Sequence, residues 1–306
     1  MHQRSNYAMT IDGQRAESSE TAQAINPATE QPICSFPLAS RAQLDTAVSA
    51  AQRAFMAWSQ TSLIERQQMV SKLGDLVEQN HDDFVRLLIT EQGKGRAAAE
   101  WEIGGSIYWL REIAKQSLDD EVVERNGDEE IVTRHTPIGV IGAITPWNFP
   151  LLLAVWKVAP ALVAGNTMVL KPSPYTPLCT LWFGELAQQV LPPGVLNVLS
   201  GGNELGQWIT EHPAIGKISF TGSTATGRRV MQSAAINLKR LTLELGGNDP
   251  AIVLRTSTPR ALPRICSGRR LPTARSSVWP ASACTSTRTC MPTWHASWWR
   301  TPRQSS

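Results

Sequence analysis

The stretch Thr145-Pro-Trp-Asn-Phe-Pro150 decides the fold, because apolar runs of different lengths flank it. The run before it, residues 137–144, is short and predicts a buried strand, whereas the run after it, residues 151–165, is long enough for a helix. Pro150 suits the first helical position, where a missing N–H is tolerated. The stretch is therefore a strand-to-helix loop, and in an open α/β sheet such loops lie at the carboxyl ends of the strands, where ligands bind.

Asn148 carries the side-chain amide of this loop, between the rings of Trp147 and Phe149. A ligand site could use that amide as a hydrogen-bond donor. The alternative is that the two rings fill the core and Asn148 caps the helix. Asparagine is a strong N-cap residue, so the local sequence by itself favours the cap.

Beyond this loop, short apolar runs alternate with helical stretches, which predicts βαβ units and a Rossmann-like parallel sheet with flanking helices. The expected strands are residues 138–144, 168–171, 195–199, 217–220 and 241–245, and the expected helices are 151–165, 178–190, 203–211 and 224–235.

The region before residue 137 has a different organisation. Residues 1–38 are mixed and rich in turns, and helices are expected from Ser40 to Trp58, from Ser62, around residues 84–92 and over residues 100–115. Ser40 and Ser62 each begin a capping box. Asn126-Gly127 separates two β-rich runs and predicts a hairpin over residues 121–136. This ribbon could pair with another subunit or could be a plain solvated hairpin.

Three further motifs follow expected strands. Residues 220–227, Phe-Thr-Gly-Ser-Thr-Ala-Thr-Gly, leave a strand and enter a helix, as a phosphate-binding turn or a plain capped βα turn would. Lys171 ends a strand and could reach a ribose or phosphate, or could be a surface lysine. Glu244 lies within an apolar strand, where burial would favour its protonated form and suit a general base. A core glutamate paired with Lys239 or Arg240 is the alternative.

Composition narrows the class of protein. The 306 residues carry a net charge of +3 and a hydrophobic fraction of 42%, as expected of a globular chain with a sizeable core. The five cysteines show neither metal-ligand spacing nor a paired framework, so cytoplasmic thiols are expected. The start has no apolar segment typical of a secretory signal. Lys157, Pro160 and Asn166 interrupt the most apolar stretch, which argues against a membrane span.

A break in composition follows Leu254. The 52 residues 255–306 contain no Asp, Glu or Lys but nine Arg, three Cys and four Trp, amid dense Ser, Thr and Pro. We expect disorder there, because few periodic apolar faces are present to form a core. A nucleic-acid-binding tail would need a fold signature besides its basic charge, so no nucleic-acid partner is expected.

The motifs of residues 145–150, 170–173, 220–224 and 243–247, in this order and spacing, resemble the aldehyde dehydrogenase superfamily from about Ile25 to Leu254. The resemblance implies NAD(P)-dependent oxidation of a small aldehyde to a carboxylic acid and a homo-oligomeric parent protein. In the family, a cysteine thiolate attacks the aldehyde, hydride passes to the nicotinamide, and water hydrolyses the resulting thioester.

The resemblance also implies site residues. Asn148 matches the amide that helps to hold the oxyanion, and Glu244 matches the glutamate that activates the hydrolytic water. Lys171 matches the lysine on the adenosine ribose, and Gln207 lies on the adenine side. The cofactor-binding positions implied are Ile144, Pro146, Trp147, Lys171, Ser173, Gly202, Gly206, Phe220, Thr221, Gly222, Ser223, Gly227, Leu245 and Gly246.

Two departures from the family pattern qualify this interpretation. Pro174 replaces a glutamate that binds the ribose hydroxyls in many members, so NAD and NADP both stay open. The family's Phe-x-Asn-x-Gly-Gln-x-Cys segment should fall near Val278, but residues 275–284 read Arg-Ser-Ser-Val-Trp-Pro-Ala-Ser-Ala-Cys. Cys284 and Cys290 have no matching surroundings. We therefore expect this chain to be inactive as it stands, with a non-catalytic dinucleotide-binding fragment as the alternative function.

The break and the loss of resemblance coincide, which suggests a frameshift near codon 255. The organisation expected is an N-terminal segment with helices over residues 1–120, an oligomerisation-type hairpin over 121–136, a dinucleotide-binding α/β region over 137–254, and a non-matching tail over 255–306.

Overall fold

A computed structural model describes residues 6–117, 119–127, 129–247, 249–252 and 281–285 of the chain. The chain divides into two units, Met1–Leu245 and Gly246–Ser306. The first unit contains a seven-stranded sheet with its helices, and the second contains a pair of strands. The boundary between the units, after Leu245, precedes the change in composition, which follows Leu254.

The central sheet has the strand order β11-β10-β7-β8-β9-β1-β2. Five of its strands are parallel: β7 (Val140–Ile144), β8 (Thr167–Lys171), β9 (Leu196–Val198), β10 (Lys217–Gly222) and β11 (Arg240–Leu245). From β7 the chain adds β8 and β9 on one side and then β10 and β11 on the other. Such a reversal of strand order is a topological switch point, where open α/β sheets bind ligands. The predicted parallel sheet is confirmed.

The sheet is mixed, because two N-terminal strands extend it. β1 (Met9–Ile11) is antiparallel to β9, and β2 (Gln14–Ala16) pairs with β1. Asp12 and Gly13 form the turn between them, and both residues have positive φ, 52° and 77°. The two strands were not expected, since each has only three residues. β3 (Thr21–Ile25) and β4 (Pro32–Pro37) form a separate hairpin.

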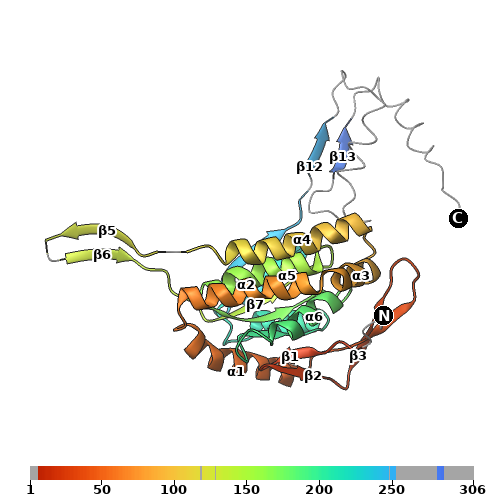
Figure 1. Cartoon of the computed structure of the whole chain (residues 1–306), viewed down its shortest axis with the longest axis horizontal. Coiled ribbons are helices and arrows are strands. Elements are labelled where there is room, and N and C mark those ends of the chain that lie inside the picture. The colour runs from red at the N-terminus through yellow and green to blue at the C-terminus, as the bar shows by residue number, and fades with distance from the viewer. Residues whose placement is uncertain (1–5, 118, 128, 248, 253–280, 286–306) are drawn as a thin grey trace. The chain divides into compact units, whose positions relative to one another are not determined.

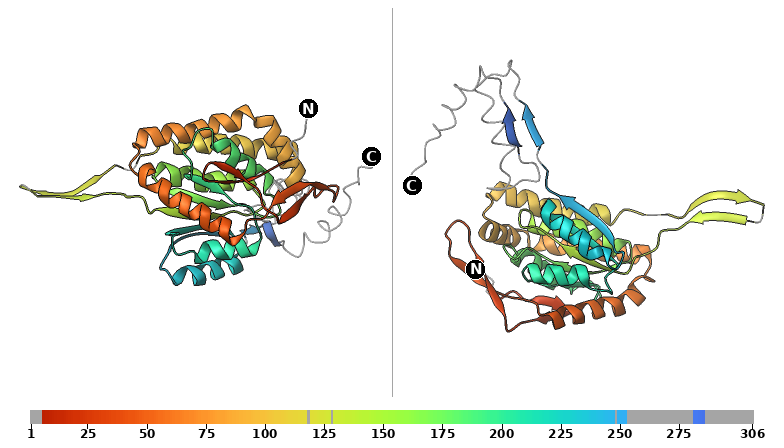
Figure 2. Two further views of the ribbon diagram at one scale, coloured as in Figure 1. Left: turned by 90° about the horizontal axis from the view of Figure 1, so that it is seen from below. Right: turned by 180° about the vertical axis from the view of Figure 1, so that it is seen from behind.

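Helices cover the sheet in layers (Figure 1). α1 (Arg41–Trp58), α7 (Asn203–Glu211) and α8 (Thr224–Ala235) contact one face, and α5 (Pro150–Val163) and α6 (Leu178–Ala187) contact the other. α2 (Leu63–Gln79), α3 (His81–Gln92) and α4 (Arg96–Ile113) pack on α5 and α6 as an outer layer. In Figure 2 the teal α7 and α8 lie on the side of the sheet opposite the orange outer helices. No helix in the described ranges combines the length and apolar character that a membrane span requires.

The helix ends agree with the sequence signals. The Ser40 hydroxyl accepts from the N–H of Gln43 at 3.2 Å, and the Gln43 side chain accepts from the N–H of Ser40 at 3.0 Å. Ser62 and Glu65 form the same reciprocal pair at the start of α2. Gly93 ends α3 in the left-handed conformation, where glycine has no steric penalty. α4 begins at Arg96, four residues earlier than expected.

The predicted hairpin around Asn126-Gly127 is confirmed. β5 (Glu121–Asn126) and β6 (Glu129–Thr133) form a two-stranded ribbon separate from the seven-stranded sheet, and every residue of both strands is exposed. The ribbon carries half-exposed to largely exposed apolar side chains, namely Val122, Val123, Ile131 and Val132.

In the second unit, β12 (Asp249–Ile252) pairs in parallel with β13 (Ala281–Thr285). β13 includes Cys284, and no strand was expected there. The remaining expectations for residues 255–306, including disorder and the surroundings of Cys290, lie outside the described residues.

Replacing Leu170 by alanine should destabilise the first unit strongly. Leu170 is fully buried in β8, between β7 and β9. A truncated core leucine leaves a cavity that costs about 2–5 kcal/mol of unfolding free energy. Urea unfolding followed by tryptophan fluorescence measures the loss. Val122→Ala on the exposed ribbon is the matched control and should cost below about 0.5 kcal/mol. Equal losses in the two variants would contradict the assigned strand order.

Candidate functional site

The parallel register brings the sequence-predicted residues to one edge of the sheet. Lys171 of β8 is paired with Ile144 of β7, and Ile144 is paired with Phe220 of β10. One position further along, Thr221 of β10 is paired with Glu244 of β11. These residues come from four strands, and they meet because parallel strands end at the same edge of a sheet. The edge lies over the switch point between β7 and β10.

Lys171 is a buried cation at this edge, so the alternative of a surface lysine is wrong. Its side chain is 4% exposed, and Nζ donates a hydrogen bond to the carbonyl of Pro172 at 3.0 Å. Among the described residues no carboxylate forms an ion pair with it. Burial lowers the pKa of Lys171 to about 8, because the charged ammonium is poorly solvated there. An anionic or hydroxyl-rich ligand at this edge would compensate the charge.

Lys157 is a second buried cation, which reaches the sheet from α5. Its Nζ donates to the hydroxyl of Thr221 at 2.8 Å and to that of Ser219 at 3.2 Å. Burial lowers its pKa to about 8, and the negative charge of Glu244 partly opposes that shift. Lys157 thus links α5 to β10 by hydrogen bonds and is close enough to Glu244 for the two charges to interact.

The turn from β10 into α8 needs glycine at two positions. A Cβ on Gly222 would lie 2.5 Å from the ring of Phe220, so the ring occupies the space beside the glycine. A Cβ on Gly227 would lie 2.5 Å from the Leu245 side chain, because α8 packs closely on β11. The Ser223 hydroxyl caps α8 by accepting from the N–H of Thr226 at 3.2 Å. The geometry is a capped βα turn, and its helix N-terminus also favours an anion.

The start of α7 lies beside Lys171. Gly202 caps this helix in extended conformation and has no atom within 4 Å of a Cβ built on it. A Cβ on Gly206 would lie 3.9 Å from Ile144 and 4.0 Å from Lys171. Gly206 therefore faces the same edge as the ends of β7 and β8. The exposed Gln207 donates to Glu211 at 2.8 Å, within its own helix.

Asn148 does not cap α5, which corrects the interpretation that the local sequence favoured. Phe149 occupies the N-cap position without a side-chain hydrogen bond, and Pro150 begins the helix. The N–H groups of Leu151 and Leu152 instead donate to Glu102 Oε1 at 3.0 and 3.3 Å. A fully buried carboxylate on another helix takes the place of the local cap, so the Asn148 side chain is free for another role. Its Oδ1 is buried and has no hydrogen-bond partner among the described residues.

The expected burial of Glu244 is wrong. Its side chain is exposed, because β11 is the edge strand of the seven-stranded sheet. The alternative of a core ion pair is wrong as well. Lys239 donates instead to the carbonyls of His212 and Ile215, at 2.6 and 2.9 Å. Glu244 lies at the carboxyl edge with its carboxylate accessible.

The other predicted positions divide by exposure. Trp147 and Pro146 are half-buried in the loop after β7, and Ser173 is buried just beyond Lys171. Leu245, the last residue of β11, is exposed, and so is Gly246, the first residue of the second unit. The predicted residues that belong to the first unit thus lie at the carboxyl edge of its sheet and on the helices α7 and α8.

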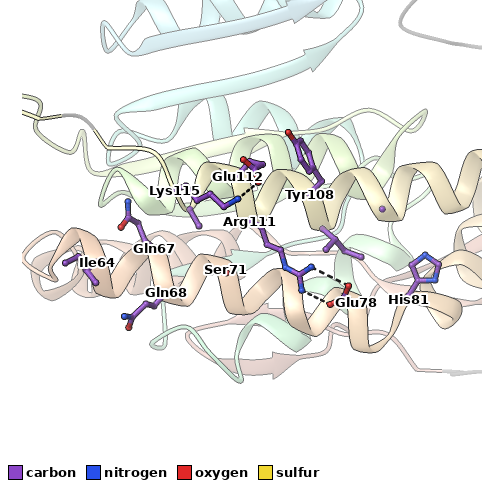
Figure 3. A pocket seen from close by; sticks show the side chains of 13 residues that line it. Ile64, Gln67, Gln68, Ser71, Glu78, His81, Tyr108, Arg111, Glu112 and Lys115 are labelled. Atoms are coloured by element: carbon purple, nitrogen blue, oxygen red, sulfur yellow. Dashed lines mark hydrogen bonds and ion pairs between the residues drawn. The ribbon is translucent and has the colours of Figure 1, made fainter.

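A hollow on the surface lies elsewhere, between α2 and α4 (Figure 3). Four of its charged side chains are paired with one another, since Arg111 pairs with Glu78 at 2.6 Å and Lys115 pairs with Glu112. None of the residues that line it belongs to the carboxyl edge of the sheet. We therefore do not assign it to the site.

The sheet has a doubly wound α/β topology, and the switch point, the glycine turn and the two buried lysines make its carboxyl edge a candidate ligand site. Residues 14–267 match the aldehyde dehydrogenase family, beyond the expected range at both ends. The chain belongs to the aldehyde dehydrogenase family, whose members are oxidoreductases.

Relatives and solved structures agree with this assignment. The chain is 44% identical over 244 residues to aldehyde dehydrogenase LUC3 of Fusarium sp.. The matched segment covers 80% of this chain and 52% of that protein. An NAD+ complex of an aldehyde dehydrogenase from Bacillus cereus matches with a TM-score of 0.89 at 32% identity, over 95% of this chain and 61% of that one. An NADP-dependent enzyme of E. coli matches with a TM-score of 0.88 at 32% identity, over 95% and 62%. The chain spans about half the length of the curated relatives it matches.

Three buried charged residues near the candidate site were not predicted from the sequence: Lys94, Glu102 and Lys157. Glu102 lies on the apolar face of α4 with Ala99, Ile103 and Ser106, so a carboxylate at that position was a detectable signal. Lys157 is the one charged residue of the apolar helix α5. Lys94 lies between two helices, and its sequence surroundings gave no signal.

Replacing Lys171 by methionine should make stability less dependent on pH. The folded-state pKa of about 8 lies below the ordinary value of 10.5, so between these values the unfolded chain holds the proton and the folded chain has lost it. The penalty for burying the charge is complete below pH 8 and disappears as the pH rises. From pH 7 to pH 10, the wild type should therefore gain about 1–3 kcal/mol relative to Lys171→Met.

Denaturant unfolding at each pH measures this difference. The exposed Lys115 serves as control, because Lys115→Met should keep a constant offset from the wild type over the same range. A constant offset for Lys171→Met would show that Lys171 is not titrating as a buried group.

Proposed function

We propose that the carboxyl edge of the sheet binds NAD or NADP, and that the chain is the cofactor-binding part of an enzyme that oxidises a small aldehyde to a carboxylic acid. The proposal depends on one observation: Ile144, Gly206 and Gly222 lie at one switch point together with Lys171, a buried lysine for which the described residues provide no ion-pair partner. The NAD+ complex and the NADP-dependent enzyme among its structural relatives support the choice of cofactor.

The residues present fit a dinucleotide. Lys171 would bind the adenosine ribose, for which a buried ammonium without an ion-pair partner is suited. Open space at Gly202 leaves room on the adenine side, and Gly206 lies close to Lys171 there. The N-terminus of α8, which follows Gly222 and Ser223, would hold a phosphate through its free N–H groups. Phe220, Pro146 and Trp147 would line the remainder of the pocket.

Two side chains would act on the aldehyde. The Asn148 amide would donate a hydrogen bond to the aldehyde oxygen as negative charge develops on it, which stabilises the transition state. Glu244, at the exposed end of β11, would take a proton from the water that releases the product. Lys157 would keep this neighbourhood positive through its bonds to Thr221 and Ser219. The bound nicotinamide supplies the two-electron acceptor.

The nucleophile is the part of this function that the sequence lacks. No Phe-x-Asn-x-Gly-Gln-x-Cys segment occurs in the chain. We propose a change of reading frame near codon 255, so that aldehyde oxidation belongs to the longer protein and this chain is inactive. A non-catalytic dinucleotide-binding fragment is the second candidate function, and the absence of that sequence segment favours it.

Other properties of the parent protein stay proposals. Pro174 leaves NAD and NADP as equal candidates. The fully exposed ribbon of β5 and β6, with its valines, suits an oligomerisation arm. Cys34 and Cys179 are free thiols, which suits a reducing compartment such as the cytoplasm.

The full 306-residue chain should bind NAD+ or NADP+ saturably, and Lys171→Met should weaken that binding about tenfold, because one hydrogen bond from a charged donor is lost. Isothermal titration calorimetry with each nucleotide measures both affinities and decides between the two cofactors. Lys115→Met, a surface variant of the same chemistry, should bind as the wild type does. Absence of saturable binding of either nucleotide at millimolar concentration would refute the proposal.

The nucleotide sequence downstream of codon 254 should encode the missing segment in another frame. We expect one of the two alternative frames to contain Phe-x-Asn-x-Gly-Gln-x-Cys followed by a long open stretch. The protein made from that repaired frame should then reduce NAD(P)+ when an aldehyde is added. If neither frame contains the segment, the non-catalytic fragment becomes the function of this chain.

A further inference from the structure

Buried hydroxyl groups hold the backbone on both sides of Asn148. The carbonyl of Trp147 accepts from the Thr176 hydroxyl at 3.4 Å, and the carbonyl of Pro150 accepts from the Thr180 hydroxyl at 3.1 Å. Both threonines are buried. These two contacts fix the ends of the segment and leave the carbonyl of Asn148 itself to be bound by another group.

That group is Lys94, which follows α3 and is inaccessible to solvent. Its Nζ donates to the carbonyl oxygen of Asn148 at 3.0 Å and lies 4.4 Å from the centroid of the Phe149 ring. The same Nζ forms a buried ion pair with Glu102 Oε2. One ammonium group thus contacts two consecutive residues of the loop and a carboxylate on α4.

Glu102 connects this lysine to the start of α5. Its Oε1 accepts from the N–H groups of Leu151 and Leu152, while Oε2 pairs with Lys94. The loop is therefore held from Asn148 to Leu152 by two buried side chains of opposite charge. Asn148, bound by Lys94, is the one predicted site residue in the described ranges to which either side chain forms a hydrogen bond.

The Asn148 side chain has no comparable anchor. Its Oδ1 is buried and unpartnered among the described residues, so no bond to that oxygen determines which way the amide points. Its orientation therefore follows from its backbone, and Lys94 binds that backbone directly.

We propose that Lys94 and Glu102 are positioning residues, which orient the Asn148 amide toward the aldehyde by fixing the carbonyl of Asn148 and the first turn of α5. The inference rests on the proposed function of Asn148 as the donor to the aldehyde oxygen. Neither residue would touch the aldehyde or the dinucleotide.

Glu91 provides a matched comparison for a merely structural role. It is buried on α3 and accepts from the N–H groups of Leu178 and Cys179, at 2.8 and 2.9 Å, at the start of α6. Like Glu102 on α5, it accepts from two N–H groups at the start of a helix, although it uses one oxygen for each of them. In the described part of the chain no hydrogen bond joins Glu91 to the loop of Asn148. A substitution that only weakens a buried helix cap should therefore have the same effect at Glu91 as at Glu102.

The test is the side-chain amide signal of Asn148 in the full chain, labelled with 15N-asparagine, in the absence of nucleotide. Loss of one signal pair in Asn148→Asp identifies it. We expect the signal to shift or to split into several lines in Lys94→Met and in Glu102→Gln, and to stay unchanged in Glu91→Gln. The signal of Asn166, whose Oδ1 accepts from Ile138 at 2.6 Å, is the internal reference and should stay constant.

Glu102→Gln keeps an acceptor for the α5 N–H groups, so it tests the proposal even if Lys94→Met does not fold. An unchanged Asn148 signal in Glu102→Gln, or an equal change in Glu91→Gln, would overturn the proposal. Because no nucleotide is present, the result is separate from that of the nucleotide titration. A failed titration with a displaced Asn148 signal would refute the proposed function and leave the positioning of the amide in place.

Discussion

The carboxylate of Glu102 accepts the N–H groups of Leu151 and Leu152 at a place that solvent does not reach. Those groups would otherwise be left without partners inside the protein, because the chain provides no local cap for α5. A lone buried carboxylate would be unfavourable, and Lys94 compensates its charge. Removing one partner of such a pair costs about 3–5 kcal/mol, since the other charge stays buried. The outer helices α3 and α4 are thereby joined to the loop over the switch point.

The alternation of strands and helices after residue 137 could be predicted, because each apolar run has a length and period of its own. α7 and α8 have the predicted bounds, and each parallel strand lies within three residues of its expected range. β1 could not be predicted in this way. Met9–Ile11 is too short to show a period, and it is a strand because Thr10 pairs with Val198, far along the chain. The pairing of two segments so far apart in the chain depends on the tertiary structure, and the local sequence does not reveal it.

In the candidate site too, some features follow from the local sequence and others from contacts between distant residues. Lys171 and the β10 turn could be placed at the carboxyl edge, because each directly follows an apolar run. Glu244 was expected to be buried because its neighbours are apolar, but exposure depends on the strand order, and β11 is the edge strand. Asn148 was favoured as a cap because local statistics do not include Glu102, which lies 49 residues before Leu151 in the chain. Contacts between distant residues decided both outcomes.

The ribbon of β5 and β6 pairs only within itself in the described part of the chain, and every residue of its two strands is exposed. An isolated pair of strands is marginally stable, whereas β7 and β8 lie in the interior of a sheet covered on both faces. The ribbon can therefore open without disturbing the rest of the first unit. Deuterium should replace its amide hydrogens quickly and independently of denaturant, while those of β7 and β8 should exchange only when the whole sheet unfolds. Amide hydrogens of the ribbon and of the central sheet should therefore exchange at separate rates, governed by local opening and by global unfolding respectively.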